Sequence, residues 1–408
     1  MNINKLEVLA PAGDEERFNA AINYGANAVY LGRKQFGMRS SPLNFDFEQL
    51  VAAVNAAHAK GIKVYLTCNT LPRNNEIPYF EQFVKEAVEA NVDALIVADI
   101  GLLMLIKRYA PDMEIHISTQ TGIVNYVTAR ELYDLGAKRI VLARELSLDE
   151  IAEIRAKTSP DLDIEAFVHG AMCVSFSGRC LLSQYLVNRD ANRGECAQPC
   201  RWGYHLVEEK RPGEFFPIFE DEKGTYILNA KDMCMIEHID KLAAAGVTSL
   251  KIEGRAKSAY YVTVVTNAYR MAVDEYYKNP DNFVLPDWIR DEVYKVSHRK
   301  YCNGFFFGTP EQSQYYENSG YIREYDVVAV VEKCKNGTVY CTQRNRFFAG
   351  DTVELLAPSQ KPVILILNKI FDENGNEIET ANHAMMKFSF ESDLIFPEGT
   401  VIRKQVEK

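Results

Sequence analysis

The stretch EAFVHGAMCVSFSGRCLLSQYLVNRDANRGECAQPC, residues 165–200, decides how the rest of the chain is interpreted. It begins as an apolar strand and then carries four of the nine cysteines, at Cys173, Cys180, Cys196 and Cys200. Isolated cysteines usually behave as small apolar residues, whereas thiolate ligands must converge on one point and so recur close together. Glycines that permit tight turns accompany them at Gly170, Gly178 and Gly194. The clustering therefore predicts a metal site.

Three chemistries compete for these thiols. Disulfides need an oxidising compartment, but the chain begins MNINKLEVLAP, without the charged and apolar regions of an export signal, so we expect a cytoplasmic protein. Tetrahedral zinc accepts four thiolates as readily as an iron–sulfur cluster does. Zinc sites favour ligand pairs about two to four residues apart. The six residues between Cys173 and Cys180 therefore favour the cluster, and zinc stays open as the alternative metal.

Outward from this stretch, short apolar segments alternate with amphipathic stretches of helical period. The segments are LEVLAP from Leu6, AVYLG from Ala28, KVYLTCN from Lys63, ALIVAD from Ala94, EIHIST from Glu114, RIVLAR from Arg139, DIEAFVHG from Asp163 and SLKIEG from Ser249. Parallel strands that are buried on both faces have this pattern. It predicts an α/β protein with a (β/α)₈ TIM-like barrel, in which a cysteine-rich insertion separates strands 7 and 8.

The chain is expected to divide into three regions. Residues 1–280 form the barrel, with its cysteine-rich insertion at 170–248. Residues 281–320 form a linker that carries a basic and aromatic segment. In residues 321–408 the pattern changes to six segments of period two, which predict a small antiparallel β-barrel. The dipeptides Asn336-Gly337 and Asn374-Gly375 are typical of its hairpin turns.

Barrel enzymes carry their chemistry at the C-terminal ends of the strands. The residues expected there are Pro11, Ala12, Gly13, Asn69, Asp99, Thr119, Gln120, Arg144, Glu145, His169, Glu253 and Arg255. Cys173 and Cys180 follow the seventh strand, so the metal should lie over the barrel mouth. A metal that only braces the insertion is the alternative.

The same stretch resembles a known family. Its residues Glu165, Phe167, Gly170, Ala171, Met172, Cys173, Gly178, Cys180, Leu182 and Ser183 are similar to the motif of the U32 family, the collagenase-like peptidases. With RGECAQPCRW, KIEGR and VSHRKY, the chain looks most like the branch that hydroxylates the wobble uridine of tRNA to 5-hydroxyuridine. The resemblance covers most of the chain. It implies a [4Fe–4S] cluster on the four cysteines, prephenate as the hydroxyl donor, tRNA as a partner, and pairing with a related subunit.

This resemblance suggests roles for the polar residues of the mouth. Arg144 and Arg255 would hold the two carboxylates of prephenate, because guanidinium groups bind carboxylates in a bidentate manner. His169 would transfer a proton or support the metal ligands. The catalytic candidates are His169, Arg144, Arg255 and Glu253, with Arg33, Arg39 and Arg179 in reserve. Ion pairs of the arginines with Glu145 and Glu253, and a structural histidine, are the alternatives.

The other cysteines are interpreted as packing residues. Cys234 lies in a predicted helix among apolar residues, which favours a structural thiol, although it could replace one of the four ligands. Single thiols in strands or beside aromatic rings stand at Cys68, Cys302, Cys334 and Cys341.

The linker contains the candidate RNA-binding residues. These are Arg290, Lys295, His298, Arg299 and Lys300, beside Tyr301 and a run of phenylalanines. Cations hold phosphates while rings stack on unpaired bases. A basic segment that packs its rings between two domains is the alternative. The net charge of −10 argues against non-specific nucleic-acid binding, so an RNA partner needs such a local face. No apolar run is long enough to predict a membrane span.

Two other functions are set against the hydroxylase. A thiol peptidase needs one activated cysteine beside a histidine, for which Cys173 and His169 are the candidates, but four gathered thiols favour a metal. A metallopeptidase would need an open zinc position and mixed ligands, which a cysteine-only set does not offer. A zinc-braced RNA-binding adaptor without chemistry is the third interpretation.

Overall fold

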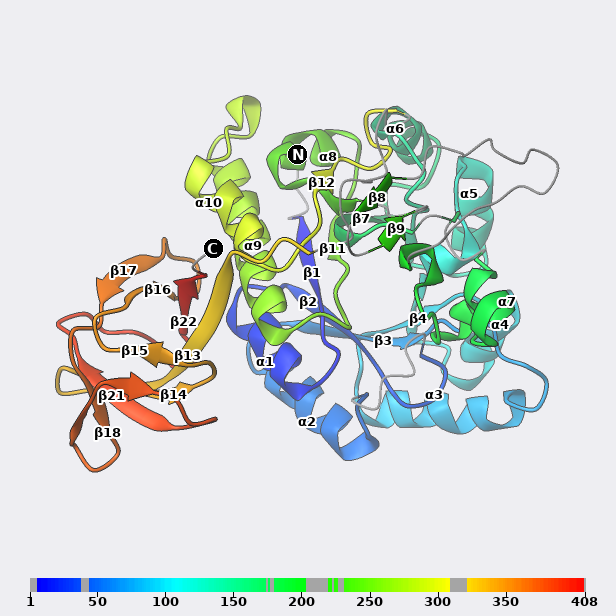
Figure 1. Cartoon of the computed structure of the whole chain (residues 1–408). Helices are drawn as coiled ribbons and strands as arrows, with labels where there is room; N and C mark the ends of the chain where they lie inside the picture. Colours follow the sequence, from blue (N-terminus) through cyan, green and yellow to red (C-terminus); the bar gives the residue numbers. More distant parts are fainter. Residues whose placement is uncertain are drawn as a thin grey trace, which may run out of the picture.

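A closed barrel of eight parallel strands forms the larger part of the molecule, and a C-terminal antiparallel sheet lies beside it (Figure 1). The structure is a computed structural model that describes residues 6–37, 44–173, 175–176, 180–202, 219–221, 224–226, 231–308 and 321–406. Successive barrel strands pair in chain order, and β11 closes the barrel by pairing with both β1 and β7. The predicted TIM-like barrel is confirmed.

Each of the eight predicted apolar segments contains a barrel strand. These strands are β1 (Glu7–Pro11), β2 (Ala28–Gly32), β3 (Lys63–Cys68), β4 (Ala94–Val97), β5 (Glu114–Ile117), β6 (Arg139–Val141), β7 (Asp163–Ala171) and β11 (Ser249–Ile252). The surrounding helices are α1 (Glu15–Asn23), α2 (Phe47–His58), α3 (Phe80–Glu89), α4 (Ile100–Tyr109), α5 (Tyr126–Asp134), α6 (Leu148–Ala156), α8 (Ile239–Ala244) and α9 (Ala259–Lys278). Short 3₁₀ turns η1 (Ile77–Tyr79) and η2 (Thr119–Thr121) belong to the loops at the barrel mouth. All residues of β2, β4 and β11 are buried, as expected for strands covered on both faces.

Side-chain caps fix where the mouth loops end and the helices begin. The Asp46 carboxylate accepts a hydrogen bond from the Gln49 amide at 2.9 Å, and the Gln49 side chain accepts one from the Asp46 amide at 3.0 Å. Ser147 and Glu150 form the same reciprocal pair before α6. These capping boxes satisfy amides that lack partners at a helix start. They hold the ends of two loops that follow β2 and β6.

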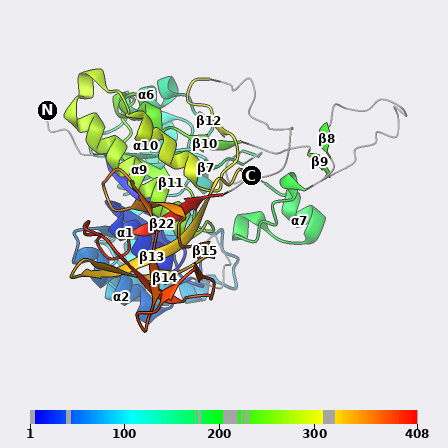
Figure 2. The same cartoon turned by 60° about the vertical axis from the view of Figure 1, so that its left-hand side comes forward.

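The cysteine-rich insertion leaves the barrel after β7 and returns at β11. It contains α7 (Leu182–Val187), η3 (Ala191–Arg193), η4 (Pro199–Arg201), β8 (Phe219–Asp221), β9 (Gly224–Tyr226), β10 (Asp232–Cys234) and η5 (Ile236–His238). The element α7 and the β8–β9 pair stand out from the barrel in Figure 2. The predicted helix at Cys234 is wrong. Strand β7 continues to Ala171, and its last residues pair with β10, so the chain is extended there.

The linker runs back along the barrel before the C-terminal sheet begins. Its elements are η6 (Pro280–Asn282), α10 (Asp287–Glu292), η7 (Val293–Lys295) and β12 (Tyr301–Cys302). Strand β12 pairs in parallel with β10, which joins the linker to the insertion.

The C-terminal region forms a curled antiparallel sheet, as the period-two pattern predicts. Its elements are β13 (Tyr325–Lys335), β14 (Thr338–Gln343), β15 (Phe347–Phe348), β16 (Thr352–Leu356), β17 (Val363–Ile366), β18 (Ile370–Asp372), β19 (Glu377–Ile378), β20 (Thr380–Ala381), β21 (Lys387–Glu391) and β22 (Val401–Gln405). Asn336 and Gly337 both have positive φ, at 52° and 78°, as expected for the hairpin between β13 and β14. In the second dipeptide only Gly375 has positive φ, because the Asp372 carboxylate holds the amides of Asn374 and Asn376.

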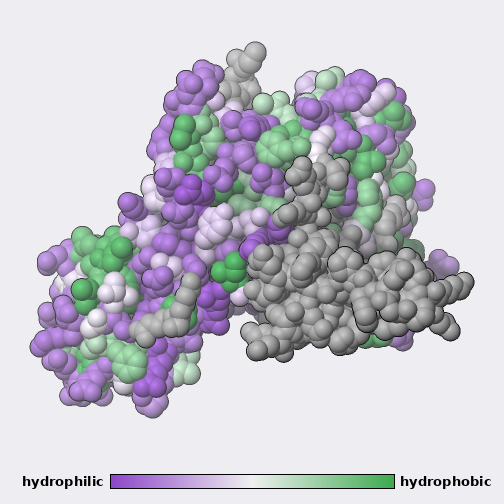
Figure 3. Space-filling view, turned by 45° about the horizontal axis from the view of Figure 1, so that its top comes forward, coloured by the Kyte–Doolittle hydropathy of each residue, from purple (hydrophilic) through white to green (hydrophobic). Residues whose placement is uncertain are grey.

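The two parts share buried contacts. Leu356 and Val401 of the C-terminal sheet belong to the barrel core. The Tyr24 hydroxyl of the barrel lies 2.8 Å from the Leu356 carbonyl oxygen. Within the described residues no helix is long and apolar enough to cross a membrane. The described part of the face in Figure 3 is mainly hydrophilic, with apolar side chains in small separate groups.

Candidate functional site at the barrel mouth

A cavity of about 230 Å³ opens at the C-terminal ends of the barrel strands, between the barrel and the insertion. All four clustered cysteines line it, together with three cationic side chains and one carboxylate. The charged residues are Arg144, Lys251, Arg255 and Glu253. The remaining lining includes Tyr30, Thr67, Asn69, Ile96, Ser118, Thr119, Gln120, Val141, Phe167, Ala171, Met172, Leu182, Ala191, Gln198 and Pro199. The cysteine-rich stretch thus faces the barrel mouth, as its position after strand 7 suggests.

The four cysteines approach the cavity from two segments. Cys173 follows β7 and Cys180 precedes α7, whereas Cys196 lies before η4 and Cys200 within it. None of the nine cysteines, all of which lie in described residues, forms a disulfide. The Gln198 amide donates a hydrogen bond to the Cys196 sulfur at 3.4 Å. Such amide donors stabilise a thiolate.

The electrostatics of Cys173 suit a cation. Burial raises the pKa of its thiol, and the neighbouring Cys180 and Cys196 raise it further, while Arg144 and the Ser175 backbone act in the opposite direction. Thiols that oppose one another's ionisation are deprotonated together when a positive centre joins them. Among the described residues, no group of three or more His, Cys, Asp or Glu side chains stands in a metal-binding arrangement. The four thiols have the chemistry of metal ligands and share one cavity, but they do not form such a group as they stand. Their convergence on one centre is part of the proposal below.

Arg255 is fixed in the cavity wall. Its guanidinium donates to the Thr67 hydroxyl at 3.2 Å and to the Asn44 side-chain oxygen at 2.9 Å, and the residue is 7% exposed. A Cβ at position 32 would lie 2.5 Å from one of its terminal nitrogens, so the glycine in Gly32 makes room for the guanidinium. The arginine is therefore held in position before any ligand binds.

Arg144 and Glu253 form a looser pair across the mouth. The Arg144 guanidinium lies 3.9 Å from the Glu253 carboxylate and stacks on the Phe167 ring, 3.9 Å from its centroid. Gly170, with φ of 108°, allows β7 to approach the backbone of Glu253, where a Cβ would come within 2.6 Å of the carbonyl oxygen. Arg144 thus lines the cavity, as a ligand-binding role requires, and it also lies near the Glu253 carboxylate, as the ion-pair alternative requires.

His169 does not line the cavity, so the geometry gives no support to proton transfer by this residue, and its catalytic role stays a prediction. Its side chain is fully buried among the rings of Tyr261, Tyr269 and Tyr301. The Tyr301 hydroxyl donates to the Val293 carbonyl at 2.8 Å, so its 3.3 Å contact with His169 Nε2 makes that nitrogen the donor. Burial and the nearby cations lower the histidine pKa to about 3. His169 is a neutral packing residue behind the site.

The other predicted residues divide between the cavity and its surroundings. Asn69, Thr119 and Gln120 line the cavity, whereas Asp99 caps α4 through a 3.0 Å bond from the Leu102 amide. Pro11, Ala12, Gly13 and Glu145 are not among the lining residues. Arg33 forms an ion pair with Glu86. Gly178 and the reserve arginines Arg39 and Arg179 lie outside the described residues.

Cys234 also stays outside the cavity lining. It pairs with His169 across the β7–β10 ladder, and removal from water raises the pKa of its thiol to about 12. This environment is that of a structural thiol.

The basic linker residues have contacts inside the protein. His298 stacks on Tyr301, and Arg299 donates to the Tyr321 hydroxyl at 3.1 Å; both side chains are about 2% exposed. Burial therefore argues against RNA contacts by these two residues. Arg290 pairs with Asp287 and Asp291, Lys295 pairs with Glu292 and Glu354, and Lys300 is exposed.

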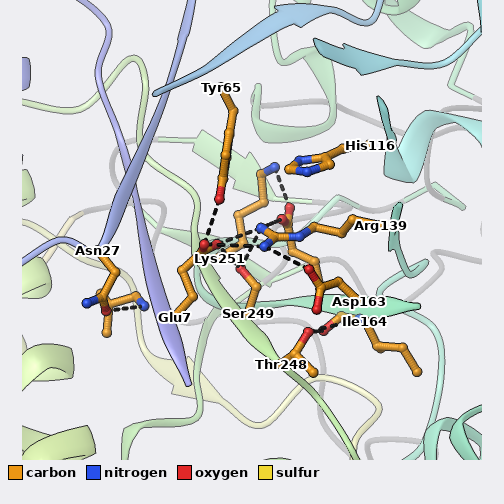
Figure 4. A network of polar contacts seen from close by, with 12 residues as sticks. Glu7, Asn27, Tyr65, His116, Arg139, Asp163, Ile164, Thr248, Ser249 and Lys251 are labelled. Carbon is orange, nitrogen blue, oxygen red and sulfur yellow. Dashed lines mark hydrogen bonds and ion pairs between the residues drawn. The ribbon is translucent and has the colours of Figure 1, made fainter. Parts of the chain in front are cut away.

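An ionic network below the cavity was missed by the sequence reasoning (Figure 4). The Arg139 guanidinium lies 2.5 Å from Glu7 and 3.1 Å from Glu165, and Lys251 donates to Glu165 at 2.6 Å. A lysine in SLKIEG and a glutamate in DIEAFVHG are charges inside buried strands, which is the signal that could have found them. Lys251 connects this network with the cavity.

Comparison with known proteins agrees with this arrangement. Residues 13–315 match the model of peptidase family U32, and residues 323–403 match the peptidase family U32 C-terminal domain. The chain belongs to the U32 family. The tRNA hydroxylation protein P1 of Bacillus subtilis (strain 168) is 37% identical to this U32 protein over 98% of this chain and 95% of its own length.

Two further relatives carry different names. The tRNA hydroxylation protein P of Escherichia coli (strain K12) is 37% identical over 87% of this chain and 86% of its own. A collagenase of Porphyromonas gingivalis (strain ATCC BAA-308 / W83) is 35% identical over 76% of this chain and 75% of its own. The family thus includes proteins named for RNA hydroxylation and for proteolysis.

Proposed function

We propose that this U32 protein hydroxylates the wobble uridine of tRNA to 5-hydroxyuridine, with prephenate as oxygen donor and a [4Fe–4S] cluster on Cys173, Cys180, Cys196 and Cys200. The observation that carries the proposal is that the four cysteines and, among the described residues, three cationic side chains line one cavity at the barrel mouth. The relative that covers 98% of this chain, C-terminal domain included, is named for tRNA hydroxylation. This full-length similarity supports an RNA-modifying activity for this chain.

The four cysteine thiolates would hold the cluster on the insertion side of the cavity. When bound, such a cluster supplies redox-active, Lewis-acidic iron beside a small ligand. On the barrel side, Arg255 is held by Thr67 and Asn44, and Arg144 lies on Phe167. Both line the cavity, where guanidinium groups would position carboxylates. The two walls would orient an anionic donor between them.

The position of the site determines which conformation the target uridine must adopt. The cavity lies between the barrel strands and the insertion, so a uridine must leave its base stack to bring its ring there. Wobble bases stand in a single-stranded loop, where this costs least. A related partner subunit would act outside this cavity, as part of the RNA-binding surface.

A thiol peptidase is less well supported by the geometry. It would need a histidine beside its cysteine, but His169 is buried among three tyrosines and does not line the cavity that Cys173 lines. The zinc-braced adaptor shares the cysteine set but gives no role to the three cations at the barrel mouth. We therefore place hydroxylation before both.

Nucleoside mass spectrometry of tRNA tests the proposal. A strain that lacks this gene and any redundant hydroxylase should regain 5-hydroxyuridine when the wild-type chain is expressed, and should not regain it with Cys180→Ser. Cys302→Ser is the matched control, because Cys302 lies on β12 outside the cavity lining. No gain of hydroxyuridine with the wild-type chain, or full activity of Cys180→Ser, would reject the proposal.

A further inference from the structure

Lys251 occupies an unusual position at the floor of the cavity. It is the third residue of β11, its side chain is 6% exposed, and it lines the cavity from within the barrel. Its ammonium group donates to the Glu165 carboxylate at 2.6 Å, and Glu165 is fully buried. Figure 4 shows Lys251 within this network of polar contacts. A lysine is rarely buried to this degree unless something fixes its charge.

The contacts of Lys251 leave hydrogen-bonding capacity on the cavity side. An ammonium group has three N–H donors, and Glu165 takes one. The nitrogen also lies 4.4 Å from the centroid of the Tyr30 ring, in a cation–π contact that uses no hydrogen-bond acceptor. Within the described part of the chain, Glu165 is the hydrogen-bond acceptor of this ammonium group. A buried donor that faces a cavity is satisfied when a ligand oxygen binds there.

Charge balance of Glu165 does not depend on Lys251 alone. Arg139 also contacts the Glu165 carboxylate, at 3.1 Å, while Glu7 accepts from Arg139 at 2.5 Å and from Ser249 at 2.8 Å. The Glu165 carboxylate therefore has Arg139 as a second cation, on the side away from the cavity. Lys251 is the member of the network that extends it to the cavity.

Two of the cavity cations lie near one aromatic ring. Phe167 has Arg144 3.9 Å from its centroid and Lys251 5.5 Å from it. Arg255 lines the same cavity, and among the lining residues that the structure describes Glu253 is the one carboxylate. With Glu165 beneath Lys251, the described charges around the cavity still leave a positive balance, which favours an anionic ligand.

We propose that Lys251 is a ligand-binding residue, and that its ammonium group donates a hydrogen bond to an acidic oxygen of the small organic anion that Arg144 and Arg255 hold. This inference rests on the proposed function, because it takes the oxygen donor to be that anion. The lysine fixes the inner end of the anion at the barrel floor, and Glu165 holds the lysine head in place. Cations at both ends would select a ligand whose acidic groups stand apart.

Prephenate titration by isothermal calorimetry tests this on the purified, anaerobically prepared full chain. Lys251→Met should raise the dissociation constant roughly tenfold to a hundredfold, the value of a hydrogen bond to a charged group. Lys241→Met is the matched control, since this exposed lysine of α8 lies against Phe307. Removing the cation alone also leaves Glu165 with less compensation, so a second variant is needed.

The double variant Lys251→Met/Glu165→Gln removes both charges of the pair. If Lys251 only balanced Glu165, this variant would bind prephenate as tightly as the wild type, and the inference would be overturned. We expect it to melt close to the wild type and still to bind weakly. The hydroxyuridine content of tRNA, measured with the same variants, should fall with both and stay unchanged with Lys241→Met.

The two proposals fail in different ways. A wild-type chain that restores hydroxyuridine and binds prephenate, with Lys251→Met indistinguishable from it, would overturn the role of Lys251 alone. A wild-type chain that neither binds prephenate nor restores hydroxyuridine would overturn the proposed function, and the role of Lys251 with it. If the wild-type chain restores hydroxyuridine but does not bind prephenate, prephenate is rejected as the oxygen donor. Lys251 would then be tested by tRNA alone, and unchanged hydroxyuridine with Lys251→Met would overturn its role.

Discussion

The Arg403 guanidinium lies 2.7 Å from the Glu292 carboxylate, and both side chains are almost fully buried where the C-terminal sheet meets the linker helix α10. Glu354 lies 2.6 Å from the same guanidinium and 2.9 Å from Lys295, so strands β16 and β22 are tied to the linker by one ionic cluster. The basic residue Lys295, which the sequence suggested for RNA, thus joins the two parts of the protein. The C-terminal sheet is held against the barrel in a defined position.

We expect Arg403→Met to destabilise the protein strongly. Removal of the cation leaves Glu292 buried with less compensation, which costs about 3–5 kcal/mol in comparable sites. Urea unfolding gives the free energy directly. Lys387→Met is the control, because its pair with Glu332 is half-exposed and should contribute less than about 1 kcal/mol. Equal losses in the two variants would show that the buried cluster has no special role.

Acid should weaken the barrel through Glu7. Burial alone would raise the pKa of this carboxyl, but the charge and hydrogen bonds of Arg139, with those of Tyr65 and Ser249, lower it to about 2. The folded state therefore holds the proton less well than the unfolded state, whose pKa is about 4.5. The contribution of Glu7 to the free energy of unfolding is roughly 3 kcal/mol. It is fully present above pH 4.5 and is lost as the pH falls toward 2.

Glu7→Gln should remove this acid-dependent loss and lower stability at neutral pH. Denaturant unfolding between pH 6 and pH 2.5 measures both effects. Glu81→Gln is the control, because Glu81 forms an exposed pair with Lys85. An unchanged slope below pH 4.5 in Glu7→Gln would mean that another group produces it.

His169 should act in a different pH range. Its pKa falls from an ordinary value of 6.5 to about 3 in the folded protein, first through burial and then through nearby cations. Between these values the unfolded chain binds a proton that the folded protein does not, so stability falls by up to about 1.4 kcal/mol per pH unit as pH drops below 6.5. His169→Gln should flatten the curve from pH 6.5 to 4.5, whereas His383→Gln, at an exposed position, should leave it unchanged.

The same variant separates a packing role from a catalytic one. We expect His169→Gln to keep hydroxyuridine formation at neutral pH wherever it stays folded, because the imidazole does not line the cavity. Loss of product in a folded His169→Gln protein would restore the histidine to the catalytic residues.

Gly32→Ala should impair ligand binding through Arg255. The new Cβ would lie 2.5 Å from the guanidinium and 2.9 Å from the Thr67 hydroxyl that holds it, so the arginine must move. We expect prephenate affinity to fall about tenfold, within the range of a lost charged hydrogen bond. Gly37→Ala is the control, because its Cβ would have Arg33, Thr67 and Gly32 as nearest neighbours, at 3.3 Å or more. Equal affinity in the two variants would argue that Arg255 does not hold the ligand.

Barrel strands were predictable because burial on both faces leaves a continuous apolar run, and β2, β4 and β11 are such runs. The placement of Arg144, Glu253 and Arg255 at the mouth followed from the rule that residues after the strands gather there. The local pattern was misleading at Cys234. Its apolar neighbours suit a helix, but this segment forms strand β10, which pairs with the last residues of the long strand β7.

The sequence did not predict which side chains would contact one another. His169 and Arg299 have the residue types of a functional site, yet both are buried. The rings around His169 include Tyr261 and Tyr301, which come from distant parts of the chain. Lys251 was missed although a charge inside an apolar strand is a signal, because the strand alone does not identify the partner of that charge. A lysine inside an apolar segment gives no sign of whether it turns toward an acid, a cavity or solvent until β7 supplies Glu165 beside it.

The metal at the barrel mouth is the central claim, and the iron and acid-labile sulfide content of anaerobically purified protein tests it most directly. We predict iron and sulfide in equal amounts with a broad visible absorption band, both lost in Cys180→Ser and kept in Cys302→Ser. Stoichiometric zinc without sulfide, or a colourless wild-type chain that Cys180→Ser does not alter, would contradict the account.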